Sequence, residues 1–124
     1  MNIKEVVKSL SKGNFVKLPN WSKDTYLRIE YCRCNRTILL YIFKYDENGK
    51  GIPWVADELE LASNDYMEIS NNGKCNINER LILLALKKAF IASYVPPGMV
   101  LVDGTEIEKK FNSILGACHY KVVN

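Results

Sequence analysis

Hydrophobic residues near the start of the chain recur with the period of a helix. Four of them have the i, i+3, i+4, i+7 spacing of one helix face: Ile3, Val6, Val7 and Leu10. This spacing predicts a short amphipathic helix over residues 2–11 that ends at Gly13. The residues that follow, 14–19, predict a first strand that stops at Pro19.

Two longer segments have strand patterns of different kinds. Residues 25–33 alternate strictly between Leu27, Ile29 and Tyr31 on one face and Tyr26, Arg28, Glu30 and Cys32 on the other. Residues 36–45 are apolar on both sides, which predicts a central strand covered on both faces by helices or by a second subunit. Asn48-Gly49 then predicts a tight turn.

The remaining pattern predicts an α+β fold: an N-terminal helix packed on a small antiparallel sheet, followed by a helical C-terminal extension. A short strand is expected at 52–55, a helical turn at 56–63 and a last strand at 65–70. Asn71-Asn72-Gly73 marks the boundary between a core, residues 1–72, and an extension, residues 73–124.

Two helices are expected in the extension. Asn76 with Glu79 predicts a cap for a helix that runs to about Tyr94, and Thr105 with Glu108 predicts a capping box for a second helix that stops near Gly116. Residues 95–104 form a break with a short extended piece between them. Residues 118–124 are compatible with an edge strand.

The helix expected near 77–94 is apolar almost all round. Its polar sector, which holds Arg80, Lys87 and Lys88, also contains Leu84 and Ile91. A small chain buries such a helix most easily by self-association. We therefore expect a homo-oligomer, a dimer or a tetramer, with this helix in an interface.

Composition and charge narrow the possible partners. A chain of 124 residues with 48% hydrophobic content supports one compact domain. The net charge of +3 disfavours a nucleic-acid partner, although Arg33, Arg36 and Lys44 keep it as a third alternative. No signal peptide is visible and the apolar runs are too short for a membrane span, so no membrane partner and a cytoplasmic location are expected.

Catalytic and metal motifs do not stand out. The chain has one histidine, His119, and neither a nucleophile elbow nor a phosphate loop, so we expect no enzyme and no cofactor. The spacing of the four cysteines, Cys32, Cys34, Cys75 and Cys118, matches no metal site and favours unpaired thiols. An acidic cluster, Asp57, Glu58 and Glu60, is compatible with a divalent cation but fits the first turn of a helix better.

Aromatic residues in polar surroundings favour a binding site instead. Seven candidate ligand-binding residues are Trp21, Tyr26, Arg28, Trp54, Asn64, Asp65 and Tyr66. Flat rings stack on purines, worth ~1–3 kcal/mol per base; arginine binds phosphates in bidentate geometry, and Asp or Asn oxygens accept hydrogen bonds from ribose hydroxyls or amines. The alternative is structural: the tryptophans cover the core or an oligomer contact, and Tyr26 with Arg28 forms a solvated strand face.

A series of short motifs lies along residues 1–70, and it is carried by Gly13, Val16, Trp21, Pro53, Trp54, Leu59, Leu61, Ala62, Asp65 and Tyr66. Their order resembles that of the second Thoeris anti-defence family of small phage proteins, which has Trp at the position of Tyr66. Two features depart from it. The loop reads Asn20-Trp21-Ser22 instead of Gly-Trp-Asn, and residues 75–124 have no counterpart in the short members.

The resemblance implies a homo-oligomeric sponge in the host bacterial cytoplasm. Such a protein sequesters a cyclic nucleotide immune signal, glycocyclic ADP-ribose or a cyclic oligonucleotide, without cleaving it. It further implies pockets between subunits, with Trp54 and Tyr66 stacking on the ligand and Asp65 accepting a hydrogen bond. The alternative function is a protein–protein interaction inhibitor that binds a host defence enzyme through the apolar C-terminal helices.

Overall fold

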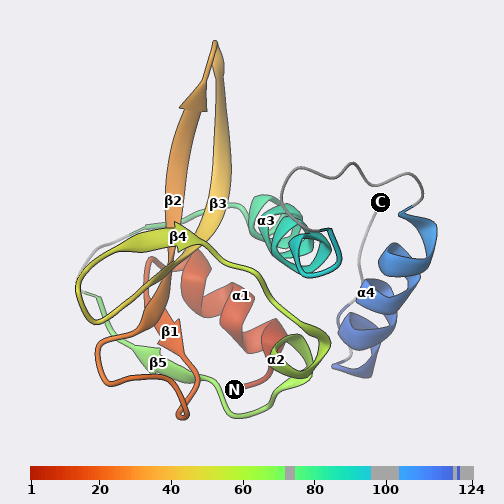
Figure 1. Ribbon diagram of the computed structural model, residues 1–124, viewed down its shortest axis with the longest axis horizontal. Coiled ribbons are helices and arrows are strands. Elements are labelled where there is room, and N and C mark those ends of the chain that lie inside the picture. Colours follow the sequence, from red (N-terminus) through yellow and green to blue (C-terminus); the bar gives the residue numbers. More distant parts are fainter. Residues whose placement is uncertain (72–74, 96–103, 119, 121–124) are drawn as a thin grey trace.

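The protein has an α+β fold in which helices pack on one face of a five-stranded antiparallel sheet (Figure 1). The computed structural model describes residues 1–71, 75–95, 104–118 and 120. Three expectations therefore lie wholly or largely outside the described residues: the boundary at Asn72-Gly73, the break at 95–104 and the edge strand at 118–124. Among the described residues, no helix has both the length and the apolar character needed to cross a membrane.

Helix α1, Ile3–Ser11, confirms the first prediction, and local chemistry fixes both of its ends. At the start, the side chains of Asn2 and Glu5 form a capping box with each other's backbone N–H groups. At the end, Gly13 has φ +85° and its N–H donates to the carbonyl of Leu10. The N–H of Asn14 reaches back to the carbonyl of Ser9, which completes a Schellman motif.

The sheet consists of β1 (Phe15–Lys17), β2 (Tyr26–Cys34), β3 (Thr37–Tyr45), β4 (Gly51–Pro53) and β5 (Met67–Ile69), in the order β4-β3-β2-β1-β5. All neighbouring pairs are antiparallel. The predicted turn between β3 and β4 is present: Gly49 has φ +77°, and the Asp46 side chain accepts from the N–H groups of Asn48 and Lys50. The five strands predicted between residues 14 and 70 therefore all occur, although β4 is Gly51–Pro53 and not residues 52–55.

The two faces of the sheet have different surroundings. Val16, Leu27, Leu40 and Ile42 point to the helices and are buried. The opposite side chains of β3 are only half-buried, because no second layer of described residues lies on that face. Coverage of residues 36–45 on both faces by the chain's own helices is therefore wrong, and coverage of one face by a second subunit stays a prediction.

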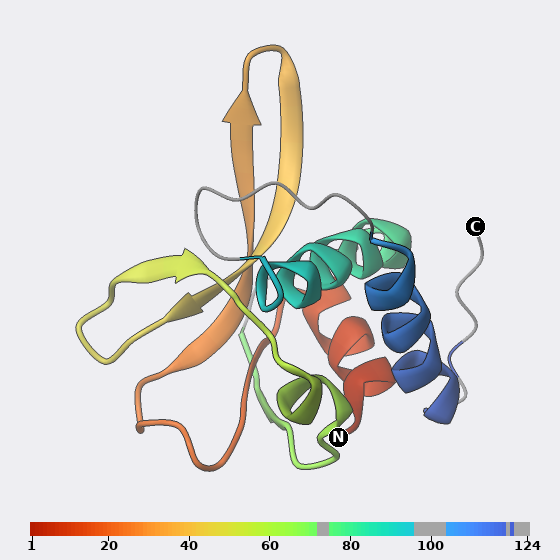
Figure 2. The ribbon, with the colours of Figure 1, turned by 45° about the vertical axis from the view of Figure 1, so that its right-hand side comes forward.

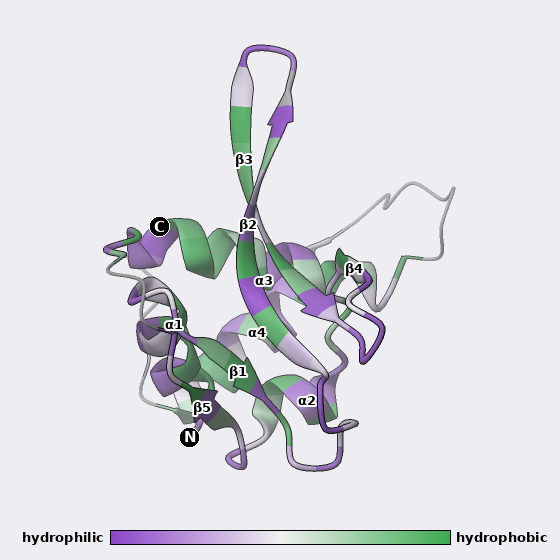
Figure 3. Ribbon diagram, turned by 90° about the vertical axis from the view of Figure 1, so that its left-hand side faces the viewer, coloured by the Kyte–Doolittle hydropathy of each residue, from purple (hydrophilic) through white to green (hydrophobic). Residues whose placement is uncertain are grey.

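The distal part of the β2–β3 hairpin, residues 31–38, projects from the body as a two-stranded ribbon, and we call it the arm (Figures 1 and 3). Tyr31 and Ile38 are each 59% exposed. The hairpin closes through the two residues Asn35 and Arg36, and Asn35 has φ +56°. A two-residue turn with a left-handed first position matches the twist of the paired strands.

Three further helices complete the fold: α2 (Glu58–Ala62), α3 (Glu79–Ala92) and α4 (Thr105–Ala117). Helix α3 packs against α1 and β3, and α4 packs against α2 and α3 (Figure 2). Five residues of α3 are buried: Ile82, Ala85, Leu86, Ala89 and Phe90. They join residues of α1 and the sheet in one hydrophobic core.

Both predicted caps of the extension differ from the structure. The cap of α3 is Asn78, whose side chain accepts from the N–H of Arg80, and not Asn76. Ile77 is held extended because its N–H donates to Ser11 and its carbonyl accepts from the Ser11 hydroxyl, so the helix cannot begin earlier. Helix α4 starts one residue before the prediction, with Gly104 as N-cap.

Candidate functional site

Trp54 is part of the hydrophobic core, with 2% of its surface exposed. Its backbone N–H donates to the carbonyl of Ile42 at 2.8 Å. This hydrogen bond holds the residue after Pro53 against the core. The ring meets Trp21 edge to face, with centroids 6.4 Å apart. Its Nε1 has no hydrogen-bond partner among the described residues. Trp54 therefore supports Trp21 from beneath and offers no free ring face to a ligand in this protomer.

Tyr66 is also a core residue, 2% exposed. Its hydroxyl donates to the carbonyl of Glu60 at 2.5 Å, and its N–H donates to the carbonyl of Met1 at 3.1 Å. Burial raises the pKa of the Tyr66 hydroxyl far above its ordinary value, so the group stays a donor. The stacking role implied for Trp54 and Tyr66 is thus not available within one protomer, because core neighbours enclose both rings.

A hollow of about 290 Å³ lies between the β1–β2 loop and the α2 segment, and we call it the α2 hollow. Its lining is Leu18, Pro19, Asn20, Leu59, Glu60, Ser63 and Asp65. The fold therefore brings the loop before Trp21 close to Asp65. Both belong to the set of residues on which the resemblance to the phage family rests. Burial is the main cause of the raised pKa of Glu60 in this lining. With Glu60 and Asp65 in its wall, the α2 hollow suits hydroxyl or amine donors and repels phosphates.

Trp21 and Asn64 lie near this hollow without closing it. The Trp21 ring is half-buried, and Lys44 Nζ sits 4.2 Å from its centroid, in cation–π geometry. Asn64 is exposed. Five of the seven predicted residues thus gather around α2, and two of those five are buried.

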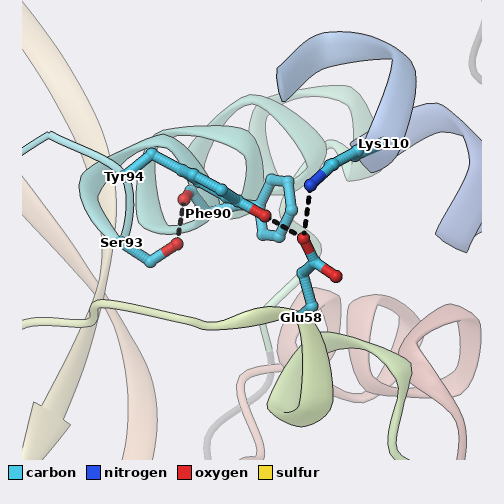
Figure 4. Close-up of polar contacts among 5 residues, drawn as sticks. All are labelled: Glu58, Phe90, Ser93, Tyr94 and Lys110. Atoms are coloured by element: carbon cyan, nitrogen blue, oxygen red, sulfur yellow. Dashed lines mark hydrogen bonds and ion pairs between the residues drawn. The ribbon is translucent and has the colours of Figure 1, made fainter. Parts of the chain in front are cut away.

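The acidic cluster has structural roles. Asp57 is the N-cap of α2, and Glu60 completes its capping box. Glu58 accepts hydrogen bonds from the Tyr94 hydroxyl and from Lys110 Nζ, the latter at 3.1 Å (Figure 4). These two donors lower the pKa of Glu58, Tyr94 first. No group of metal-ligating side chains occurs among the described residues.

The other two predicted residues, Tyr26 and Arg28, lie on the opposite side of the sheet, on the surface not covered by helices. Four rings and one guanidinium form this surface, which we call the aromatic face: Phe15, Tyr26, Phe43, Tyr45 and Arg28. Tyr26 stacks on Phe15 at 4.7 Å and on Tyr45 at 5.4 Å, so the rings form a row across three strands. The predicted face assignment of β2 is confirmed by this arrangement.

Arg28 crosses the row of rings and is held in place on several sides. Its guanidinium carbon lies 5.6 Å from the Phe15 centroid and 5.4 Å from that of Tyr45. Its Nε is 2.9 Å from Glu30 Oε1, the same oxygen that accepts the Tyr45 hydroxyl. The hydrogen bond to Glu30 raises the pKa of Tyr45, so this hydroxyl remains a donor. The Arg28 side chain is 41% exposed, and its guanidinium carries two terminal nitrogens besides Nε.

The pattern analysis did not identify Phe15, Glu30, Phe43 and Tyr45 as part of a site. The position of the β2–β3 hairpin turn could have identified the two β3 residues, because the turn fixes which residues of the two strands pair. A two-residue turn at Asn35-Arg36 pairs Tyr26 with Tyr45 and Arg28 with Phe43, as observed. Gly51, opposite Tyr45, completes the arrangement, because a Cβ there would lie 2.6 Å from the Tyr45 ring.

A second hollow of about 230 Å³ borders the aromatic face where β1 begins. Its lining is Gly13, Phe15, Arg28, Ile29, Glu30, Tyr31, Asn71, Cys75 and Ile77. The volume is below the ~300 Å³ at which ligand pockets usually begin. The hollow therefore offers a partial site, with a cation and a ring at its edge, that a ligand would share with another surface.

No protein-family model matches the chain, and the searches of curated proteins and of solved structures found no significant match. The aromatic face and the two hollows are therefore the features of this chain that bear on its function.

Proposed function

We propose that this protein binds and sequesters a cyclic nucleotide immune signal, glycocyclic ADP-ribose or a cyclic oligonucleotide, without cleaving it. In this proposal it is a viral anti-defence protein that acts in the host bacterial cytoplasm. The observation that carries the proposal is Arg28, held among aromatic rings on an uncovered sheet face beside a hollow of about 230 Å³.

The chemistry of the aromatic face matches that of a nucleotide. A guanidinium whose Nε is fixed by Glu30 is pre-oriented, so less side-chain entropy is lost when its terminal nitrogens bind a phosphate. The row of rings supplies flat apolar surface for a base. Glu30 offsets part of the Arg28 charge, which favours a ligand with a base and few phosphates over a polyanion.

Ligand binding between subunits would combine the two candidate surfaces. Within one protomer, Arg28 lies on the aromatic face, whereas Asp65 and Trp21 lie by the α2 hollow. A homo-oligomer, dimer or tetramer, would allow the cation of one subunit to act with the acceptors of another. This assembly is part of the proposal, and exposed apolar residues in α3, such as Leu81 and Leu84, support it.

A second candidate function is a protein–protein interaction inhibitor that binds a host defence enzyme. One observation favours it: a groove of about 350 Å³ between β3 and α3, which we call the apolar groove. Its lining is Ile38, Leu39, Leu40, Leu81, Leu84, Lys87, Lys88 and Ile91. Six of these are apolar, which is typical of a surface that contacts protein.

Calorimetric titration with glycocyclic ADP-ribose and with a cyclic dinucleotide tests the main proposal. We expect Arg28→Ala to weaken binding about 10- to 100-fold, since a hydrogen bond to a charged group is worth about 1.5–3 kcal/mol. Arg36→Ala, which removes the same charge from the arm, is the matched control and should bind like the wild type. Heat denaturation of the complex should release intact ligand, and a cleaved product would instead indicate an enzyme.

A thermal-shift screen separates the two candidate functions. A ligand at a hundredfold excess over its dissociation constant stabilises the folded state by about 2.7 kcal/mol, which shifts the unfolding midpoint measurably. If no cyclic nucleotide stabilises the protein, the inhibitor function becomes the better account. Under that account Leu84→Glu should abolish capture of the target enzyme, and Arg28→Ala should not.

A further inference from the structure

The arm carries positive charge without local compensation. From Tyr31 to Tyr45 the sequence contains Arg33, Arg36 and Lys44 and no acidic residue. Arg33 and Arg36 are both exposed, and neither takes part in the ion pairs found between described residues. Positive charge is therefore concentrated at this end of the molecule, where Arg36 lies in the hairpin turn and Arg33 lies on β2 close to it.

The shape of the arm fits a groove of a nucleic acid. It is a two-stranded ribbon, and Figure 3 shows its turn as hydrophilic above a hydrophobic stretch of β3. The four residues of β2 in the arm, 31–34, span about 13 Å at about 3.3 Å per residue. The major groove of B-form DNA is about 12 Å wide and 8.5 Å deep and admits a two-stranded ribbon. An arm of this length can place its turn at the floor of the groove.

The side chains of the arm also match what that groove offers. Arg33 lies two residues before the turn and Arg36 lies in the turn itself, so two guanidiniums are presented at the end of the ribbon. Arginine binds phosphates and the O6 and N7 of guanine. A bare two-stranded hairpin is only marginally stable in water, and a groove would enclose this one on both sides.

We propose that the arm inserts into the major groove of double-stranded DNA, with Arg33 and Arg36 as the principal contacts. This site is separate from the aromatic face, since Arg28 is paired with Glu30 and lies at the base of the hairpin. Duplex RNA is excluded as the ligand by the same geometry, because its major groove is too narrow for side chains to read.

Fluorescence anisotropy with a 20-base-pair DNA duplex between 50 and 200 mM NaCl tests the proposal. Two phosphate contacts predict a slope of log K against log salt of about −1.8, or about a 12-fold loss of affinity over that range. Arg33→Ala and Arg36→Ala should each reduce the slope by about 0.9. The double variant should lose measurable salt-dependent binding. Because both positions are exposed, the unfolding midpoint should not change.

Lys50→Ala is the matched control, since Lys50 is an exposed cation at the other hairpin turn of the sheet. It should bind DNA like the wild type. Absence of DNA binding, unchanged binding by the double variant, or equally tight binding of duplex RNA would each overturn the proposal. The proposal would also be overturned if the double variant lost a dimer but kept the DNA affinity of the wild type. That result would show that the arm contacts a second copy of the chain. Arg28→Ala should leave DNA binding intact, so failure of the nucleotide proposal and failure of this one are distinguishable.

Discussion

At the scale of single residues, burial decides what the aromatic side chains do. Trp54 and Tyr66 were predicted to contact ligand because they stand in polar sequence, yet both are enclosed. Trp21 is the partly exposed member of the pair of tryptophans, and its ring lies between Trp54 and the Lys44 ammonium. Trp21 is therefore the aromatic residue near α2 that a ligand can reach.

Alanine substitutions at the two tryptophans should separate these roles. Trp54→Ala should lower the free energy of unfolding by about 3–5 kcal/mol, the usual cost of removing a large buried side chain. Trp21→Ala should cost about 1 kcal/mol, as for a partly exposed position. Denaturant unfolding monitored by circular dichroism measures both. Equal losses would show that the two rings form a single packed unit.

Glu60 makes stability depend on pH in an unusual direction. Burial raises its folded-state pKa above the unfolded value, so its ionisation opposes folding. The stability associated with the protonated group is complete below the unfolded pKa and is lost as the pH rises through the folded pKa. Glu60→Gln should therefore raise the unfolding midpoint at pH 7. The difference from wild type should shrink in acid, and a constant difference from pH 3 to pH 7 would contradict this account.

At the scale of elements, turn and cap chemistry sets where each segment begins and ends. Gly13 ends α1 in the left-handed region, and its position also lies against Cys75: a Cβ there would be 3.0 Å from that of Cys75. Gly13 thus has two roles. Its left-handed conformation ends α1, and its lack of a side chain lets Cys75, in the segment before α3, pack close to it. Gly116 differs, since a Cβ there meets nothing within 4 Å.

Gly13→Ala and Gly116→Ala should have opposite effects. At Gly13 the left-handed conformation costs an L-residue about 1–2 kcal/mol, so the unfolding midpoint should fall. At Gly116, inside α4, alanine should stabilise the helix by up to about 1 kcal/mol. Thermal unfolding of the two variants checks this. A loss of stability at Gly116 would mean that close approach to another surface requires the glycine.

Periodicity predicted the elements well and their assembly only in part. The helix at 2–11, the alternating faces of 25–33 and the turn at Asn48-Gly49 follow from local sequence, and all three are confirmed. Local sequence could not predict which residue caps α3, because Asn76 and Asn78 can both act as an N-cap. A tertiary contact, Ser11 with Ile77, selects Asn78.

The candidate site was harder to predict, because its residues come from strands distant in sequence. Tyr26 and Arg28 were selected, but their neighbours Phe15 and Tyr45 become visible only once the register of the sheet is known. Trp54 was misplaced for the opposite reason: a Pro-Trp step looks like a loop, and only tertiary packing reveals that it crosses the core.

At the scale of the whole molecule, the single protomer leaves apolar side chains of the apolar groove exposed to solvent. Leu84 is 56% exposed and Leu81 46%, beside Ile38 of the arm. Light scattering should show at least a dimer at micromolar concentration. Leu84→Glu combined with Ile91→Glu should yield a monomer, because charges in the groove oppose burial. Val55→Glu, at another exposed apolar position, is the control and should keep the wild-type mass. A monomeric wild type would refute self-association.

The attachment of α4 has a consequence for how the molecule opens. Two buried residues, Phe111 and Leu115, hold this helix to the core, and its outer links are Lys110 with Glu58 and Lys87 with Glu108, all on solvent-accessible side chains. A unit fastened by so little buried surface can unfold alone while the sheet, α1 and α3 persist. Native-state hydrogen exchange should therefore show the amides of α4 exchanging through a local opening of low free energy. Those of β2 and β3 near Leu27 and Ile42 should exchange only on global unfolding.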